Sequence, residues 1–221
     1  MDQNTKKQRV AEAVLDYIDN GESLGIGSGS TVNILIENLS KVKNKIRNVV
    51  SSSVKSTELL EANGFEVSEL RDVGRLTKYI DGADEVNKDL QMIKGGGGAL
   101  TREKILAHNS NQFICIVDDS KKVDMLGKFP LPIEVIPLSR SSVSLELIKH
   151  GGRPVLRENF STDNGNLILD IHNLEIMEPI KLEQTINNIP GVVTNGIFAL
   201  DHANVLLCAS DSGIDKTDLN A

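Results

Sequence analysis

Short apolar segments alternate with amphipathic helical segments along the first 120 residues, and this alternation constrains the fold more than any other feature. The strand-like segments are residues 23–26, 48–50, 65–67, 78–80 and 113–117. Strands that are short and apolar throughout, with helices between them, are typical of a parallel sheet covered by helices. The pattern therefore predicts an α/β fold with a mostly parallel, Rossmann-like sheet and helices on both faces.

A second region begins where the composition shifts toward proline. Three of the six prolines lie in residues 129–137, as expected at a crossing between domains. The pattern beyond predicts a helix ending at residue 150, a hairpin of strands 154–157 and 166–171, a helix over 180–188 and a strand over 191–193. The apolar strand 204–208 is expected to return to the large sheet. We therefore expect a large α/β domain formed by residues 1–126 and 199–221, and a small α+β, ferredoxin-like domain over 127–198.

Charge and composition exclude several partners. The 24 basic and 31 acidic residues give a net charge of −7, which disfavours binding to nucleic acids and anionic membranes. With 5 Phe, 2 Tyr and no Trp, a stacking platform for single-stranded nucleic acid is also disfavoured. No apolar run reaches the roughly 18 residues of a membrane span, and the first residues carry no apolar signal segment. With Cys115 and Cys208 interpreted as buried free thiols, we expect a cytoplasmic protein.

A segment rich in glycine and hydroxyl groups, residues 25–31, follows the first predicted strand. Glycines let backbone N–H groups approach an anion, and the N-terminus of the following helix favours negative charge. Ser28, Ser30 and Thr31 add hydroxyl donors, although a tight turn with a helix N-cap is the alternative. The segment lacks the nucleotide P-loop pattern, and residues 51–53 place serines where a dinucleotide site needs a carboxylate. A small phosphate ester therefore fits better than a nucleotide.

Two carboxylates lie three residues apart around a glycine turn, in the order Asp81, Gly82, Ala83 and Asp84. Such a pair can face one small ligand, polarise its hydroxyl groups or move protons. The alternatives are a solvated acidic turn or a helix N-cap. A metal site has little support, because the four histidines are scattered without the spacing of metal ligands.

Four consecutive glycines at residues 95–98 follow Lys94. Because such a run is costly in chain entropy, it predicts a loop that lies against a ligand and donates N–H groups to it. Glu103 then lies about one turn into the next helix as a candidate base, and Lys121 follows a buried strand as a candidate phosphate ligand. The alternative to a functional role for Lys94, Glu103 and Lys121 is an ordinary position on the surface of the protein.

Together the four clusters suit proton transfer next to a carbonyl on a small phosphorylated sugar. They contain phosphate donors, carboxylates, a glycine-rich loop, a cation and a candidate base, with no sign of a metal, a redox cofactor or a nucleophilic Ser–His pair. One alternative is a sugar-phosphate-binding sensor without catalysis, which would not need Glu103. Another is an enzyme similar to the CoA-transferases, which would need a larger nucleotide site.

The same segments resemble ribose-5-phosphate isomerases of the A type. The matching motifs are GIGSGST at 25–31, SSS at 51–53, DGADE at 81–85, KGGGGALTREK at 94–104, GKFPLP at 127–132, GGRP at 151–154, TDNGN at 162–166 and IPGVV at 189–193. They run in order from the first helix to about residue 210. One departure is Ser28, where the family often has threonine, so that a hydroxyl donor is kept.

The resemblance implies interconversion of ribose 5-phosphate and ribulose 5-phosphate through a cis-enediolate, in the pentose phosphate pathway, without a metal or organic cofactor. It implies Glu103 as the proton acceptor, with Asp81, Asp84 and Lys94 as further catalytic residues. The substrate site that it implies consists of Ser28, Gly29, Ser30, Thr31, Asp81, Gly82, Ala83, Asp84, Lys94, Gly95, Gly96, Gly97 and Lys121. It also implies a homodimer or a homotetramer.

Overall fold

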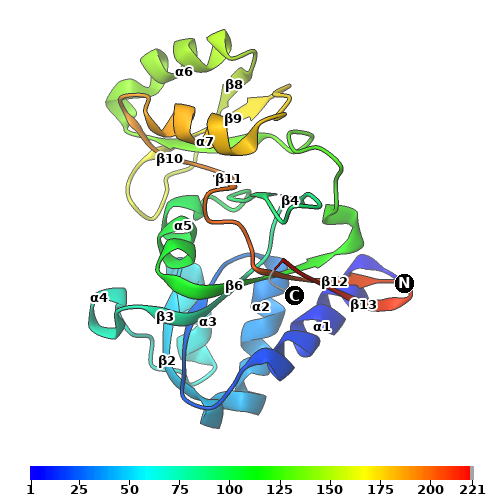
Figure 1. The fold of residues 1–221 in the computed structure, drawn as a ribbon. Helices are drawn as coiled ribbons and strands as arrows, with labels where there is room; N and C mark the ends of the chain where they lie inside the picture. Colours follow the sequence, from blue (N-terminus) through cyan, green and yellow to red (C-terminus); the bar gives the residue numbers. More distant parts are fainter. Residues whose placement is uncertain (220–221) are drawn as a thin grey trace. The chain divides into compact units, whose positions relative to one another are not determined.

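The computed structural model describes residues 1–219, and its packing divides the chain into two compact units (Figure 1). Of the described residues, the first unit contains Met1–Ala83, Arg102–Lys121 and 203–219, whereas the second contains Asp84–Thr101 and Lys122–His202. The domain limits expected from the sequence, after residues 126 and 198, stay a prediction. None of the described helices is long and apolar enough to cross a bilayer.

A six-stranded sheet forms the centre of the first unit, in the order β13-β12-β6-β3-β1-β2. Its strands are β1 (Glu22–Ile26), β2 (Ile46–Ser51), β3 (Leu76–Asp81), β6 (Ser110–Asp118), β12 (Val205–Ser210) and β13 (Gly213–Asp218). Every neighbouring pair is parallel except β12 and β13. The predicted, mostly parallel sheet is therefore confirmed. Edge strand β13 was missed because none of its residues is buried and they form no apolar run.

Helices cover both faces of this sheet, as predicted (Figure 1). On one face lie α1 (Gln3–Ala13), α2 (Ser30–Asn38) and α3 (Val54–Ala62), and on the other lies α5 (Leu100–His108). The shorter helices are η1 (Val14–Tyr17), η2 (Leu39–Lys45), α4 (Leu70–Val73) and η3 (Asp119–Lys121). The strand expected over residues 65–67 is wrong, because only a single bridge joins Val67 to Val49.

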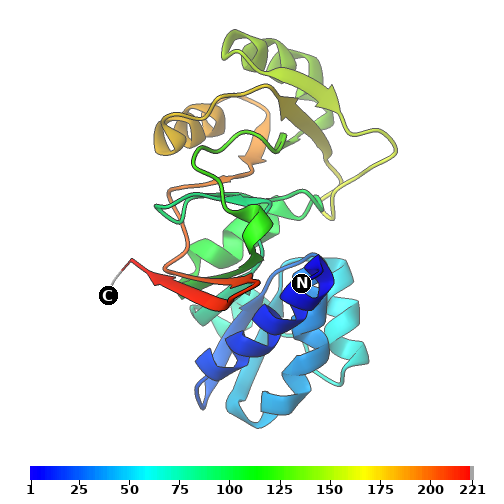
Figure 2. The ribbon, with the colours of Figure 1, turned by 90° about the vertical axis from the view of Figure 1, so that its right-hand side faces the viewer.

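A four-stranded antiparallel sheet, in the order β10-β7-β9-β8, forms the centre of the second unit (Figure 2). Its elements are β7 (Leu131–Val135), η4 (Pro137–Ser139), α6 (Arg140–Lys149), β8 (Arg153–Leu156), β9 (Leu167–His172), α7 (Pro179–Asn187) and β10 (Val192–Asn195). The chain order βαββαβ is that of a ferredoxin-like fold, as predicted.

The proline-rich segment lies within the part of the second unit that extends from Lys122 to His202. It forms β7, an inner strand whose five residues are all buried. Pro132 has no N–H to donate, but its carbonyl accepts a hydrogen bond from Gly196 at 2.8 Å. The apolar side chains Leu131, Ile133 and Val135 alternate into the core of this unit, and their burial outweighs the unfavourable proline.

A second, smaller sheet in the same unit consists of three two-residue strands. These are β4 (Glu85–Val86), β5 (Met92–Ile93) and β11 (Ile197–Phe198), paired antiparallel in the order β11-β5-β4. Strands this short leave no detectable pattern in a sequence. The glycine-rich loop follows β5, so it leaves a strand of this antiparallel sheet.

Candidate active site

The residues predicted to form the site divide between the two units. The first unit carries Ser28, Gly29, Ser30, Thr31, Asp81, Gly82, Ala83, Glu103 and Lys121. The second carries Asp84, Lys94, Gly95, Gly96 and Gly97. Hydrogen bonds join several of these residues within each unit.

Ser28 connects two carboxylates of the first unit. It lies in the loop between β1 and α2, and its backbone N–H donates to Asp81 Oδ1 at 3.0 Å. Its hydroxyl donates to Oε1 of Glu103, on α5, at 2.6 Å. Glu103 is only 3% exposed, so the alternative interpretation of this residue as a surface glutamate is wrong. Residues from three separate segments therefore meet at one serine.

Asp81, the last residue of β3, is fully buried and holds the loop after β1 in place. Its Oδ1 accepts the N–H groups of Ser28 and, at 2.8 Å, of Gly82, and its Oδ2 accepts the hydroxyl of Tyr79. These donors offset the cost of burying a carboxylate, and they rule out a solvated turn. A Cβ atom at Gly27 would lie 1.9 Å from the carboxyl carbon of Asp81, so only glycine fits there.

Tyr79 is a residue of this cluster that the sequence prediction missed. It is fully buried, and its ring lies 4.8 Å from that of Phe113 between centroids. Burial, together with the negative charges of Asp81 and Glu103, raises the pKa of Tyr79 well above its ordinary value. The phenol therefore remains a neutral donor to Asp81. The sequence did contain one indication of this contact. Tyr79 lies two residues before Asp81 on one strand, and this spacing puts both side chains on the same face of the sheet.

The start of α2 contains three of the residues that the sequence predicts for anion binding. Gly29 occupies the N-cap position with a φ of 99°, and Ser30 and Thr31 are the first two residues of the helix. Backbone N–H groups in a first helical turn have no partner within the helix and favour an anion. Lys7 of α1 donates from Nζ to Ser30 Oγ at 3.0 Å, which brings a cation to this turn. The sequence did not indicate Lys7, because a lysine in an amphipathic helix is ordinary.

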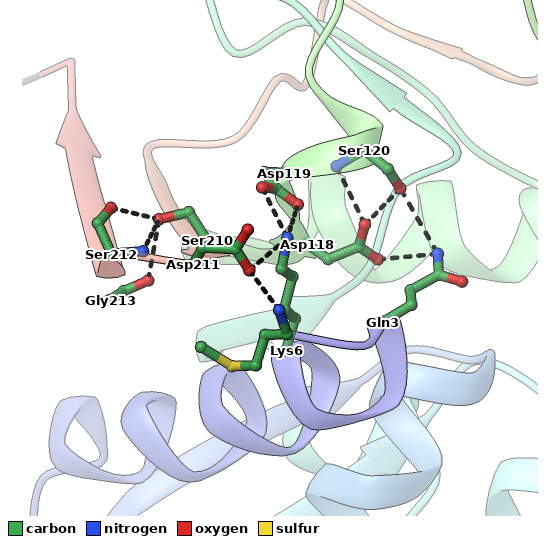
Figure 3. A network of polar contacts seen from close by, with 10 residues as sticks. Gln3, Lys6, Asp118, Asp119, Ser120, Ser210, Asp211, Ser212 and Gly213 are labelled. Atoms are coloured by element: carbon green, nitrogen blue, oxygen red, sulfur yellow. Dashed lines mark hydrogen bonds and ion pairs between the residues drawn. The ribbon is translucent and has the colours of Figure 1, made fainter.

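Lys121 ends the short helix η3, directly after β6, where the sequence placed it. This turn is attached to α1, because Lys6 Nζ donates to both carboxylate oxygens of Asp119 at 2.9 Å (Figure 3). Lys6 also forms an ion pair with Asp211 at 3.2 Å, at the end of β12. The hydrogen bond to Asp119 raises the pKa of Lys6 above its ordinary value. The position of Lys121 is therefore set by contacts within the first unit.

The glycine loop is the main feature of the candidate site in the second unit. Gly95 and Gly98 have φ values of 94° and 89°, which favour glycine, and the Gly98 N–H donates to the Gly95 carbonyl at 2.9 Å. The N–H of Gly96 donates to Asp84 Oδ2 at 2.8 Å. Gly97 is exposed, and a Cβ atom there would meet no other atom within 4 Å. The loop therefore presents Gly97 on an open side.

Lys94 precedes this loop and is only 3% exposed, so the alternative interpretation of this residue as a surface lysine is wrong. Its ammonium nitrogen lies 5.4 Å from the centroid of the Phe198 ring, a cation–π distance. Its backbone N–H donates to the Gly196 carbonyl at 2.9 Å. The side chain of Lys94 is thus buried with its ammonium group against the ring of Phe198.

Glu85 ends the DGADE motif but has a structural role within the second unit. It is buried, and its two carboxylate oxygens accept the backbone N–H groups of Gly127 at 2.8 Å and Phe129 at 2.6 Å. A Cβ atom at Gly96 would lie 3.0 Å from the Phe129 ring. Glu85 therefore supports the glycine loop through the segment that carries Phe129.

No group of three or more His, Cys, Asp or Glu side chains within residues 1–219 is arranged to hold a metal ion. The expected absence of a metal and of an organic cofactor stays a prediction. In chemical terms, the described side chains offer carboxylates for proton transfer, together with cations and N–H groups that stabilise negative charge.

The mostly parallel, Rossmann-like sheet of the first unit and the ferredoxin-like fold of the second define the α/β class of protein. The family model of ribose 5-phosphate isomerase A, also called phosphoriboisomerase A, matches residues 48–213. The chain belongs to this family and is an isomerase.

Solved structures of the family are similar to nearly the whole chain. Ribose 5-phosphate isomerase A from Neisseria gonorrhoeae is 48% identical, with a TM-score of 0.96 over 98% of this chain and 97% of that one. The enzyme from Methanocaldococcus jannaschii is 35% identical, with a TM-score of 0.91 over 97% and 98%. A D-ribose-5-phosphate isomerase in complex with phospho-erythronic acid is 35% identical, with a TM-score of 0.95 over 99% and 100%.

Proposed function

We propose that the chain interconverts D-ribose 5-phosphate and D-ribulose 5-phosphate by proton transfer between C2 and C1 through a cis-enediolate, as a step of the non-oxidative pentose phosphate pathway. The observation that carries the proposal is the buried carboxylate of Glu103, held at 2.6 Å by the hydroxyl of Ser28 in the loop that leads to an anion-binding helix N-terminus. A carboxylate in that position can act first as a base and then as an acid.

The proposed reaction requires one base and stabilisation of one oxygen. Glu103 removes the proton from C2 of the open-chain aldose, and the electron pair of that bond forms the C1–C2 double bond while the C1 oxygen gains negative charge. Glu103 then returns a proton to C1, and C2 becomes the carbonyl carbon as its hydroxyl proton is transferred to the C1 oxygen. All atoms of the sugar phosphate are conserved, so the step needs no oxidant or reductant.

The other predicted residues receive supporting roles. Lys94 and the N–H groups of Gly95, Gly96 and Gly97 offset the charge of the enediolate, because donors aimed at a developing charge lower the barrier. Asp81 and Asp84 assist ring opening and the movement of hydroxyl protons, and Gly82 and Ala83 line the sugar between them.

The phosphate is proposed to bind at the start of α2. Gly29, Ser30 and Thr31 offer backbone and hydroxyl donors, and Lys7 and Lys121 add positive charge. A relative is solved in complex with phospho-erythronic acid, which supports a sugar phosphate as the substrate class. That compound carries both a phosphate and a carboxylate. The carboxylate resembles an enediolate, because each is a planar group with two oxygens and a negative charge.

Isomerisation in heavy water with a chelator tests the proposal against a sensor without catalysis. The protein is incubated with ribose 5-phosphate and EDTA in D2O, and the ketose is analysed by NMR. Conversion with deuterium at C1 is expected, since the transferred proton exchanges with solvent on the carboxylate. Binding without conversion would support the sensor, and conversion only after addition of a metal would overturn the metal-independent mechanism.

We further propose that the protein is cytoplasmic and forms a homodimer or homotetramer, on the basis of its family alone. Light scattering after size exclusion should give two or four times the 24.0 kDa of one chain. A mass of 24.0 kDa at assay concentration would contradict this proposal and leave the proposed reaction untouched.

A further inference from the structure

Arg157 follows β8 and binds two parts of the second unit at once. Its Nε and Nη2 donate to the two carboxylate oxygens of Asp170, on β9, at 2.9 and 2.6 Å. Its Nη1 donates to the backbone carbonyl of Gly96 in the glycine loop at 3.1 Å. A planar guanidinium can hold both partners in one geometry, whereas an ammonium group acts as a single point charge. Arg157 therefore links the loop to the sheet.

Phe160 adds a second support from the same connection between β8 and β9. The guanidinium carbon of Arg157 lies 5.1 Å from the centroid of the Phe160 ring. A Cβ atom at Gly98 would lie 2.2 Å from Cζ of this ring, so the ring packs directly on the loop backbone. The loop is thus held by a cation and a ring that carry no role in the proposed chemistry.

The hydrogen bond to Gly96 determines the direction of the next N–H group. The peptide between Gly96 and Gly97 is trans and planar, so its C=O and N–H point in opposite directions. Because the Gly96 carbonyl points toward Arg157, the Gly97 N–H points away from it. Gly97 is exposed, with no atom within 4 Å of a Cβ position, so its side of the loop is open to a ligand.

We propose that Arg157 is a positioning residue, which fixes the Gly96–Gly97 peptide so that the Gly97 N–H donates to the substrate oxygen that gains charge. This inference rests on the proposed isomerisation. Removal of one oxyanion donor elsewhere costs about 10²–10³ in kcat. Because Arg157 orients the donor without being one, its replacement is expected to lower kcat by about 10-fold and to leave KM within about twofold.

Two substitutions separate this role from the stability of the fold. Arg157→Lys keeps a cation beside Asp170 but loses the planar guanidinium that also donates to Gly96. The kcat should therefore fall about 10-fold, while the unfolding temperature stays within about 2 °C of the wild-type value. Asp170→Asn keeps Arg157 beside Gly96 but removes the ion pair, so the unfolding temperature should fall while kcat stays within about twofold. Arg153→Met, at an exposed arginine on β8, the strand that precedes Arg157, controls for the loss of charge.

A readout independent of activity completes the experiment. In protein labelled with 15N-glycine, the Gly97 amide is assigned by its loss in Gly97→Ala, and its heteronuclear NOE reports order of the loop. The NOE should fall in Arg157→Lys and stay unchanged in Arg153→Met. Unchanged kcat and NOE in Arg157→Lys, or an equal loss of kcat in Asp170→Asn, would overturn the inference. If the wild-type protein fails to isomerise, the proposed function fails, and the NOE still decides whether Arg157 orders the loop.

Discussion

The two clusters of candidate site residues are built in opposite ways. In the first unit the proposed functional groups are the side chains of Asp81 and Glu103, and the backbone and hydroxyl of Ser28 hold them. In the second unit the proposed functional groups include the backbone N–H groups of a glycine loop, and the side chains of Asp84 and Arg157 hold that backbone.

This difference determines how each cluster responds to substitution. A functional side chain of the first unit can be replaced directly, and the chemistry is lost with it. A backbone N–H group cannot be removed by an ordinary substitution, so the second cluster is tested through the side chains around it. Glycine substitutions should also differ, because Gly27 lies against a carboxylate whereas Gly97 faces open space.

The largest effect is expected from Glu103→Gln in the first cluster. The amide keeps the size of the side chain but cannot accept the C2 proton, so kcat should fall by about 10²–10⁴ with little change in substrate binding. Steady-state kinetics and calorimetric titration measure the two quantities. Glu58→Gln, an exposed position on α3, is the control. Turnover close to normal in Glu103→Gln would remove this residue from the role of base.

Alanine at two glycines tests the contrast between the clusters. Gly27→Ala places a Cβ atom on the Asp81 carboxylate, so the free energy of unfolding should fall by about 1–3 kcal/mol, as for an overpacked core, and kcat should fall as well. Gly97→Ala meets no neighbouring atom, so the free energy of unfolding should stay within about 0.5 kcal/mol. Urea unfolding measures both. Equal destabilisation by the two substitutions would contradict the contrast.

The two cations proposed to bind the phosphate should affect binding more than turnover. Lys7→Met and Lys121→Ala should each raise KM by about 10-fold with a small change in kcat, as expected when a contact to phosphate is lost. Lys55→Met, an exposed lysine on α3, serves as the control. An unchanged KM in Lys7→Met would show that its contact with Ser30 does not contribute to phosphate binding.

The smallest effect concerns the buried phenol of Tyr79. Because its pKa is raised in the folded protein, its contribution to stability is present below the unfolded value of about 10 and is lost as pH rises toward the folded value. The free energy of unfolding of the wild type should therefore fall above pH 10 more steeply than that of Tyr79→Phe. Tyr17→Phe controls for the loss of a hydroxyl group. Parallel curves for the wild type and Tyr79→Phe would contradict the raised pKa.

Much of the first cluster was predictable because its residues follow strands with a clear apolar pattern. The loop containing Ser28, the end of β3 at Asp81 and the turn at Lys121 all lie where the sequence placed them. Tyr79 and Lys7 were missed, because only their contacts in the folded protein connect them to the candidate site. Tyr79 donates to Asp81, and Lys7 donates to Ser30.

The supports of the second cluster could not be predicted. Arg157 is 61 residues from Gly96 in the sequence, and Glu85 is 44 residues from Phe129. Each contact depends on how a strand or a connection folds back, and neither leaves a periodic signal. Strands β4, β5 and β11, which carry the glycine loop, are too short to show one.

The most direct test of the proposed chemistry follows the C2 hydrogen itself. Ribose 5-phosphate deuterated at C2 is incubated with the wild-type protein or Glu103→Gln, and NMR measures both ketose formation and the loss of deuterium from C2. The wild type should show a primary isotope effect on turnover, and Glu103→Gln should lose ketose formation and deuterium removal to the same extent. Removal of the C2 deuterium by Glu103→Gln at nearly the wild-type rate would show that another group is the base.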